Sequence, residues 1–392
     1  MSARVGLVAG EPSGDLIASQ VVHGLQTALP DLEVAGIGGP ALESKGMDIW
    51  HCMDALSVFG YVDALKNLPK LYRIFKDVET RFTNNPPEVF VGVDAPDFNL
   101  RLEHRLKARG IPTVHFVSPS IWAWRYERIH RIREAVSHML VLFPFELEIY
   151  EREGIAATYV GHPLADKIPM HPDARGARLA LGMDPDAKVM AILPGSRRSE
   201  IEWMAPRFLA TAAQLQARDP QLQFVVPMVN EARRAQFDHI AANFSVHKLH
   251  RLDATASKDA TPVSWQALEA CDMALVASGT ATLEAALFKR PMVISYVLSP
   301  WMRRLMAWKS GQSAPSLPWV GLPNVLSQSF VVPELLQDEA TPEHLVDTTW
   351  QLWQDTDRRE EIEQQFVQLH ETLRCDTAAK AAQAIMNVMR QA

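Results

Sequence analysis

The sequence has few cysteines, few tyrosines and no long uncharged apolar run. Its 392 residues include 3 cysteines, at positions 52, 271 and 375, and 6 tyrosines against 10 tryptophans. Cysteines so few and so widely spaced exclude a disulfide framework or a cysteine zinc site and favour a reducing compartment. Because no uncharged apolar run approaches about 18 residues, we expect no spanning helix. The apolar segment 5–9 is short and soon followed by acids, so we expect no secretory signal.

Positive charge is also in short supply. The chain has 39 Lys and Arg against 46 Asp and Glu, a formal net charge of −7. This balance argues against a dedicated nucleic-acid-binding protein, which would be basic overall. Hydrophobic residues at 47% and charged residues at 22% are typical of a soluble globular protein. At roughly 100–200 residues per domain, the length suits two domains or three.

Short apolar segments alternate with helix-like segments along most of the chain. In the first half we predict strands over residues 5–9, 33–37, 89–93, 113–117 and 139–142, and helices over 15–29, 100–109 and 126–135. In the second half we predict strands over 189–193, 224–227, 246–252, 273–277 and 292–296, and helices over 201–218, 231–243, 265–270 and 280–287. Such alternation is typical of parallel sheets covered by helices on both faces.

A polar stretch rich in Pro and Asp, residues 163–186, separates the two halves. We therefore predict an α/β protein of two doubly wound, Rossmann-like domains, residues 1–170 and 171–340, facing a cleft. A polar helical region, residues 341–392, completes the chain. Ligands of such sheets bind at the carboxyl ends of strands, beside helix N-termini. Motifs that directly follow the predicted strands are therefore the candidate sites.

Two acidic motifs follow strands of the first half. Residues 10–15 read Gly-Glu-Pro-Ser-Gly-Asp, in which glycines allow close approach of a ligand and Ser13 or Asp15 could cap a helix. In residues 92–99, Gly-Val-Asp-Ala-Pro-Asp-Phe-Asn, Asp97 suits a helix cap. Asp94 is then left to take a proton from a hydroxyl nucleophile. The alternatives are a simple turn at the first motif and two capping acids at the second.

A third motif, residues 115–125, combines a histidine, hydroxyls, tryptophans and an arginine. His115 lies within a predicted strand, which favours a core residue and leaves it a secondary base candidate. Trp122 and Trp124 could line a sugar or acyl site, or fill the wall of the cleft.

The second half has two motifs suited to phosphate. In residues 193–200, Ser196 and Arg197 open a helix, where backbone N–H groups and a guanidinium suit an anion. Arginines there would otherwise oppose the helix dipole, which disfavours a plain solvated turn.

The other phosphate motif is residues 277–284. Ser278, Gly279 and Thr280 could cradle a diphosphate, and Glu284 could accept hydrogen bonds from ribose hydroxyls. The alternative is a helix cap. Phosphate motifs in one half and acids in the other indicate a nucleotide-activated donor and an activated acceptor.

The sequence has no convincing metal-binding motif. Asp-x-Asp pairs occur at 184–186 and 355–357, but both lie in polar turns, which argues against a metal site. We expect no metal and no organic cofactor.

Two segments, 62–76 and 300–309, mix cations with apolar residues at helical spacing and suit an anionic membrane surface. Core packing of an ordinary helix is the alternative for each. The contact residues expected are Leu65, Lys66, Leu68, Lys70, Tyr72, Arg73, Trp301, Arg303, Arg304 and Trp308.

The motifs together closely resemble the lipid-A-disaccharide synthase family of Gram-negative bacteria, glycosyltransferases of the two-domain B-type fold. The resemblance spans essentially the whole chain and rests on residues 7–15, 93–99, 117–125, 193–197, 277–281 and 322–324. Pro12 and Arg198 depart from the family pattern without removing a functional group. The resemblance also implies that the last helix crosses back onto the first domain.

The resemblance implies a reaction. UDP-2,3-diacylglucosamine donates its sugar to the 6-hydroxyl of 2,3-diacylglucosamine 1-phosphate (lipid X), with inversion, which gives a β-1,6 disaccharide 1-phosphate and UDP. It implies Asp94 as the base, Arg197 on the diphosphate side and Asn324 as a further site residue. Glu11, Ser13, Gly14, Asp15 and Ser120 are expected on the acceptor side. The expected location is cytoplasmic, peripheral to the inner membrane.

Two other readings stay open at this point. One is a related B-type enzyme acting on UDP-N-acetylglucosamine, an epimerase or a cell-wall transferase; the cation-and-apolar segments argue for a lipid acceptor over the epimerase. The other is a non-catalytic lipid- or nucleotide-binding module, against which the pairing of Asp94 with Arg197 argues.

Overall fold

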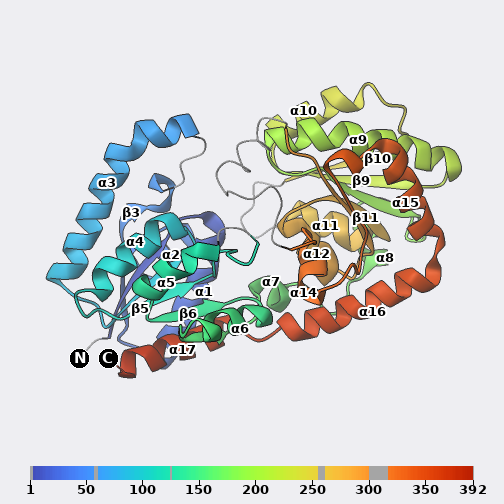
Figure 1. Cartoon of the computed structure of the whole chain (residues 1–392). Coiled ribbons are helices and arrows are strands. Elements are labelled where there is room, and N and C mark those ends of the chain that lie inside the picture. Colours follow the sequence, from blue (N-terminus) through green and yellow to red (C-terminus); the bar gives the residue numbers. More distant parts are fainter. Residues whose placement is uncertain (1–2, 57–60, 124–125, 255–260, 300–316, 392) are drawn as a thin grey trace. The chain divides into compact units, whose positions relative to one another are not determined.

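A computed structural model describes residues 3–56, 61–123, 126–254, 261–299 and 317–391, with residues 61–68 described by backbone alone. The chain divides into a first unit, Met1–Asp166 with Leu373–Ala392, and a second unit, Lys167–Thr372. The boundaries predicted from the sequence lie at residues 170 and 340. In the structure, residues 341–372 instead belong to the second unit, and the last helix belongs to the first (Figure 1).

The first unit is built on a seven-stranded parallel sheet in the order β3-β2-β1-β4-β5-β6-β7. The strands are β1 (Arg4–Ala9), β2 (Glu33–Gly38), β3 (Asp48–Cys52), β4 (Val89–Val93), β5 (Thr113–Phe116), β6 (His138–Val141) and β7 (Ala157–Tyr159). The α-helices in this part of the chain are α1 (Pro12–Ala28), α2 (Pro40–Glu43), α3 (Tyr61–Asn84), α4 (Pro96–Lys107), α5 (Ile129–Ala135), α6 (Pro144–Arg152), α7 (Pro163–Lys167) and α17 (Thr377–Gln391). All five residues of β4 are buried, as expected of a central strand with helices on both faces.

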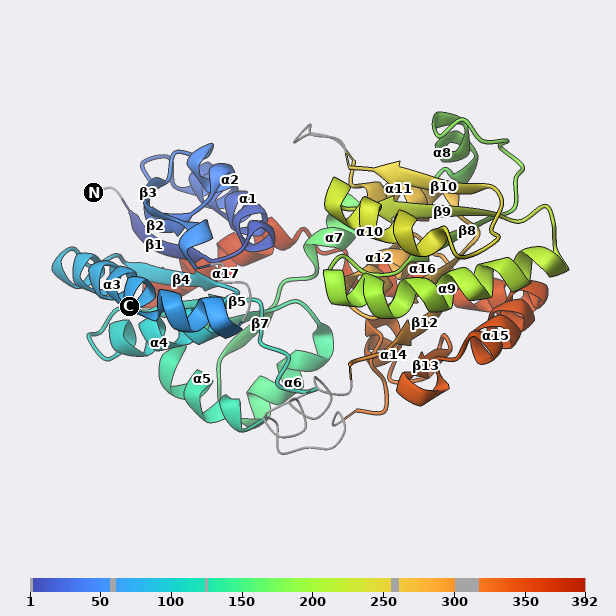
Figure 2. The ribbon, with the colours of Figure 1, turned by 90° about the horizontal axis from the view of Figure 1, so that it is seen from above.

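The C-terminal helix α17 packs against α1 in the first unit, as the red and blue ribbons of Figures 1 and 2 show. Asp166 fixes its beginning, because its carboxylate accepts the N–H groups of Cys375, Asp376 and Thr377 at 3.1, 3.0 and 2.8 Å. A carboxylate suits this place, since the first N–H groups of a helix have no partner within it.

The second unit has a six-stranded parallel sheet in the order β10-β9-β8-β11-β12-β13. The strands are β8 (Val189–Leu193), β9 (Gln223–Met228), β10 (Leu249–Asp253), β11 (Met273–Ala277), β12 (Met292–Tyr296) and β13 (Glu334–Leu336). The α-helices in the described part of this unit are α8 (Ala174–Ala180), α9 (Arg198–Arg218), α10 (Glu231–Ala241), α11 (Val263–Ala270), α12 (Thr280–Leu287), α14 (Leu322–Ser327), α15 (Pro342–Gln354) and α16 (Thr356–Leu373). Helix α15 packs against α9, which explains why residues 341–372 join this unit.

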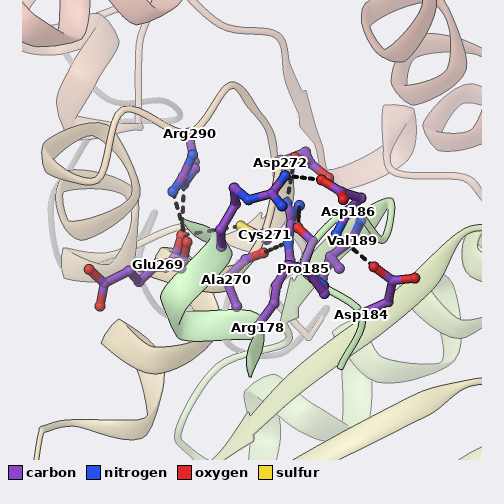
Figure 3. Close-up of polar contacts among 12 residues, drawn as sticks. Arg178, Asp184, Pro185, Asp186, Val189, Glu269, Ala270, Cys271, Asp272 and Arg290 are labelled. Atoms are coloured by element: carbon purple, nitrogen blue, oxygen red, sulfur yellow. Dashed lines mark hydrogen bonds and ion pairs between the residues drawn. The ribbon is translucent and has the colours of Figure 1, made fainter. Parts of the chain in front are cut away.

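An arginine clamp fixes the amino ends of the central strands in the second unit (Figure 3). Arg178 is 6% exposed; its Nη2 donates to Asp272 Oδ1 at 2.6 Å and its Nε to the Ala270 carbonyl at 2.8 Å. The other oxygen of Asp272 accepts the Val189 N–H at 2.9 Å, at the start of β8. The clamp therefore ties β8 to β11 at the end opposite their carboxyl-end loops.

Candidate active site

In each sheet the strand order reverses once, between β1 and β4 in the first unit and between β8 and β11 in the second. Open α/β sheets bind their ligands at such switch points, outside the carboxyl ends of the strands. The motifs at residues 10–15 and 94–99 follow β1 and β4, and those at 194–200 and 278–284 follow β8 and β11. The fold thus brings the motifs together in two pairs, one in each unit.

The turn between β4 and α4 carries Asp94, which is half-buried. Asp94 and Ala95 both have left-handed backbone conformations, with φ of 51° and 44°. The turn touches the first motif closely, because a Cβ atom on Gly10 would lie 2.8 Å from that of Ala95. Gly10 therefore allows the loops after β1 and β4 to meet.

The helix caps predicted for these two motifs are wrong. Helix α4 begins at Pro96 with Ala95 as N-cap, and the side chain of this residue makes no capping hydrogen bond. The Asp97 side chain, 87% exposed, lies in the first turn and contacts Arg128 at 3.5 Å. Helix α1 likewise begins at Pro12, without a side-chain cap from Ser13 or Asp15. Proline suits the first position of a helix, where no N–H is needed.

Asp15 has a structural partner instead. It is 3% exposed, and its carboxylate accepts the N–H groups of Gly39, Ala41 and Leu42 at 2.7, 2.9 and 3.3 Å. It therefore ties α1 to the start of α2. Of the other residues predicted on the acceptor side, Glu11, Ser13 and Ser120 are exposed and Gly14 is buried.

His115 is fully buried, with Nδ1 2.8 Å from Oε1 of the equally buried Glu103, as suits the core interpretation favoured above. Burial raises the pKa of Glu103, and the His115 partner opposes that rise. Trp122 is half-buried and packs edge-on against Phe145, with the centroids of the two rings 5.4 Å apart. Trp124 lies outside the described residues.

Glu146, at the start of α6 beside the third motif, was not predicted. It is 2% exposed and accepts the Phe143 N–H at 3.1 Å. Burial raises the pKa of its carboxyl to about 7, against hydrogen bonds that include one from Ser118.

The motif after β8 places Arg197 at the N-cap of α9, with its side chain 80% exposed. The backbone donors expected to be open to an anion are occupied, however. Oε2 of Glu200 accepts the N–H groups of Ser196 and Arg197 at 2.9 and 3.0 Å, and Oε1 lies 3.5 Å from Nη1 of Arg197. Glu200 follows Arg197 by three residues, the spacing of a capping box, so the sequence held a signal for it.

The motif after β11 turns at Gly279, whose φ is 141°, and Gly279 and Thr280 are exposed at the start of α12. The Ser278 N–H donates to the Ser295 carbonyl at 3.3 Å. Glu284, predicted beside a ribose, lies on α12, and its carboxylate accepts hydrogen bonds from Ser264 and Trp265 of α11; burial raises the pKa of this carboxyl.

Asn324 is fully buried and its side chain is hydrogen-bonded at both ends. Its Nδ2 donates to the Val332 carbonyl and to Glu334 Oε1, both at 2.8 Å, and its Oδ1 accepts the Val332 N–H at 3.0 Å. Glu334 also accepts the N–H groups of Val320 and Gly321, each at 2.9 Å. Asn324 therefore acts on the loop before α14 through Glu334, a residue that no sequence pattern singles out.

Thr282 joins that loop to the Gly279 turn. Its hydroxyl donates to the Gly279 carbonyl at 2.8 Å and accepts the Leu322 N–H at 3.2 Å. The motifs at 277–281 and 322–324 are thus physically connected.

Of the predicted membrane contacts, Lys70, Tyr72 and Arg73 are exposed on α3, with Tyr72 at 61%. Phe75 of the same segment is buried in the core. Leu65, Lys66 and Leu68 have no described side chains, and Trp301, Arg303, Arg304 and Trp308 lie outside the described residues.

No helix in the described part of the chain is long and apolar enough to cross a membrane. Nor do three or more His, Cys, Asp or Glu side chains gather there as metal ligands would.

Comparison with known proteins decides the family. A sequence model described as lipid-A-disaccharide synthetase matches residues 5–385. The lipid-A-disaccharide synthase of Bordetella parapertussis is 62% identical over 388 residues, which cover 99% of both chains. This chain belongs to the lipid-A-disaccharide synthase family. The lipid-A-disaccharide synthase of Aromatoleum aromaticum is 48% identical and aligns over 98% of this chain and 96% of its own length. The resemblance read from the motifs is therefore confirmed, and with it the assignment as a glycosyltransferase.

Solved structures confirm the fold of this lipid-A-disaccharide synthase family member. A UDP-GlcNAc 2-epimerase from Neisseria meningitidis, bound to UDP-GlcNAc, superposes with a TM-score of 0.62 at 12% identity, over 99% of this chain and 100% of that one. The glycosyltransferase of kitacinnamycin superposes with a TM-score of 0.60 at 14% identity, over 99% of each chain. At such identities the likeness shows the two-domain α/β fold alone.

Proposed function

We propose that this protein transfers 2,3-diacylglucosamine from its UDP derivative to the 6-hydroxyl of 2,3-diacylglucosamine 1-phosphate. The products are the β-1,6-linked disaccharide 1-phosphate and UDP. The observation that carries the proposal is that the family motifs with Asp94 and Arg197 each follow a strand at a switch point of its own sheet.

In the proposed reaction Asp94 takes the proton of the acceptor 6-hydroxyl. The acceptor oxygen forms a bond to C1 of the donor sugar on the face opposite UDP, and the C1–O bond to the diphosphate breaks with its electron pair leaving on UDP. An α-linked donor then gives a β-linked product in one displacement, without a covalent intermediate, as in inverting glycoside hydrolysis. A half-buried carboxylate is a suitable base for this step.

Negative charge develops on UDP as it leaves, and the second unit supplies positive charge for it. We infer that the diphosphate contacts the exposed Arg197 guanidinium, the hydroxyl of Ser278 and the start of α12 at Gly279 and Thr280. The diphosphate also takes over the N–H groups of Ser196 and Arg197 from Glu200. Asn324 holds the neighbouring loop without touching UDP.

For the acceptor we propose contacts with the exposed Glu11, Ser13 and Ser120. The acyl chains of both sugars require the enzyme to work at a lipid surface, so we propose peripheral attachment to the cytoplasmic face of the inner membrane. The exposed Lys70, Tyr72 and Arg73 of α3 suit an anionic headgroup layer.

The proposal is tested by incubating the purified protein with the two acylated sugars and analysing the products by mass spectrometry. We expect the disaccharide 1-phosphate and one equivalent of UDP, released only when both sugars are present. Conversion of non-acylated UDP-N-acetylglucosamine to its 2-epimer would favour the epimerase reading instead. Binding of both sugars without turnover would leave a non-catalytic module.

A further inference from the structure

We propose that Asn99 is a positioning residue for Asp94. Its buried side-chain amide holds the left-handed turn between β4 and α4, and so determines where the Asp94 carboxylate lies. The inference rests on the proposed function, since it takes Asp94 as the base.

The turn is strained. Asp94 and Ala95, with φ of 51° and 44°, are consecutive non-glycine residues in the left-handed region. That region costs an L-residue about 1–2 kcal/mol, and only Asn and Asp reduce the cost through their own side chains. Alanine has no such side chain. A turn of this kind persists only where the surrounding structure holds it.

Hydrogen bonds from the Asn99 side chain stabilise this turn. Asn99 is 0% exposed, and its Nδ2 donates to the carbonyl oxygen of Asp94 at 2.7 Å. The same nitrogen lies 3.3 Å from the carbonyl oxygens of Val93 and of Val8. One amide group thus joins the strained residue to the ends of β4 and β1, the two strands of the switch point.

Gly92 leaves room for the Asn99 side chain. A Cβ atom on Gly92 would lie 3.0 Å from Cβ of Asn99 and 2.2 Å from Oε1 of Glu103. Gly92 therefore leaves the space that both side chains fill, and Glu103 is held by His115 at 2.8 Å. Oδ1 of Asn99 has no hydrogen-bond partner among the described residues, so donation by Nδ2 is the contribution of this side chain.

The experiment compares Asn99→Ala with a matched buried amide of the second unit, Gln216→Ala. Gln216 is 7% exposed, and its Nε2 also donates to backbone carbonyls, those of Leu222 and His247, at 2.9 and 2.7 Å. Both variants are expected to lower the melting temperature. Only Asn99→Ala is expected to lower kcat, by about 100-fold per folded molecule, because a displaced base costs that much. Affinity for UDP is expected to stay unchanged in both.

A second variant makes the test specific to the turn. Glycine adopts the left-handed conformation without penalty, so the loss of the Asn99 amide should cost less when residue 95 is glycine. We expect the drop in kcat caused by Asn99→Ala to be roughly fivefold smaller in the Ala95→Gly background than in the wild type.

The proposal is overturned if folded Asn99→Ala keeps the wild-type kcat, if Gln216→Ala lowers kcat equally, or if the Ala95→Gly background makes no difference. Asp94→Asn is measured in parallel. Should Asp94→Asn itself stay active, the base assignment fails; should it be inactive while Asn99→Ala is active, only the positioning role fails.

Discussion

At both switch points a loop turns through residues with positive φ, but the residues at the turn differ between the two units. In the first unit the loop after β4 turns through Asp94 and Ala95, non-glycine residues at positive φ. In the second unit the loops after β8 and β11 turn through Gly195 and Gly279, with φ of 106° and 141°. The conformations share a sign of φ, but the side chains at the turn differ.

The difference matches what each loop has to present. Glycine turns let a ligand come close to the backbone at the starts of α9 and α12, as phosphate-binding loops require. At α9 the N–H groups of Ser196 and Arg197 are held by Glu200, which an anion would have to displace. A turn through Asp94 places a side chain at the strand end, at the cost of strain that Asn99 offsets. We infer that the second unit is organised to present backbone and Arg197, and the first to present one carboxylate.

The largest expected effect tests the first half of this comparison. Asp94→Asn keeps the shape of the side chain but removes its basicity, so kcat should fall by up to about 10⁴-fold. Binding of UDP, which we assign to the second unit, should not change. Initial rates with both acylated sugars and titration with UDP measure the two quantities. Asp97→Asn, an exposed acid three residues later, is the control and should stay within a few-fold of wild type. A substantial rate in Asp94→Asn would mean that the turn presents something other than a base.

The next effect tests the second half. Arg197→Ala removes a charge from the proposed diphosphate site and should lower kcat/KM by about 10³-fold and weaken UDP binding. Arg197→Lys should recover only part of this loss, because an ammonium cannot make the paired contacts of a guanidinium. Arg198→Ala, the exposed neighbour, serves as the control. Equal losses in the two alanine variants would show a general charge effect, not a specific contact.

The next expected effect is on stability and concerns Glu146, the buried glutamate at the start of α6 in the first unit. Burial raises the pKa of Glu146 to about 7 from an ordinary value of 4.5. The folded state therefore resists ionisation of this carboxyl, and the wild type loses stability as the pH rises from 4.5 through 7. Glu146→Gln cannot ionise, so it should be more stable than wild type above pH 7, by at most about 3 kcal/mol, and equal to it below pH 4.5.

Urea denaturation at several pH values measures this change. The control is Glu148→Gln, whose carboxylate is 70% exposed beside Arg152 and should show no such pH dependence. If the free energy of unfolding depended on pH in the same way in Glu146→Gln and in the wild type, ionisation of Glu146 would not destabilise the folded state.

The sequence predicts most of the fold because the central strands are uniformly apolar. Strands β4, β8, β11 and β12 lie at their predicted residues. Strand β3 (Asp48–Cys52) escapes prediction because it is a partly exposed edge strand of mixed polarity, and β7 and β13 have only three residues each. Strand β10 begins later than predicted, at Leu249, because Lys248 has a φ of 50°.

The candidate site is predictable where one segment of chain contains all of the signal. Asp94 and Arg197 each follow an apolar strand directly, so position and chemistry indicate them together. Asn99, Glu103 and Glu334 act through residues far along the chain, such as Val8, His115 and Val320. Asn99 does stand in the motif at residues 92–99 and also bonds the nearby Asp94, but its contact with Val8 could not be indicated by a local pattern. The contacts of Glu103 and Glu334 likewise form only in the folded chain.

The smallest expected effect concerns Glu200, which now occupies the backbone donors of Ser196 and Arg197. If the diphosphate takes over those donors, the Glu200 carboxylate opposes UDP binding by charge and by competition. Glu200→Gln keeps an oxygen that can accept the same N–H groups, so α9 stays capped, but it removes the charge. We expect UDP affinity to rise about fivefold, since a charge at a helix N-terminus contributes up to about 1 kcal/mol. Calorimetric titration with UDP at low ionic strength measures it, and Glu202→Gln, an exposed glutamate two residues later, is the matched control. Weaker binding in Glu200→Gln would show instead that Glu200 orders Arg197 for the diphosphate, and the second unit would then depend on a side-chain carboxylate as the first unit does.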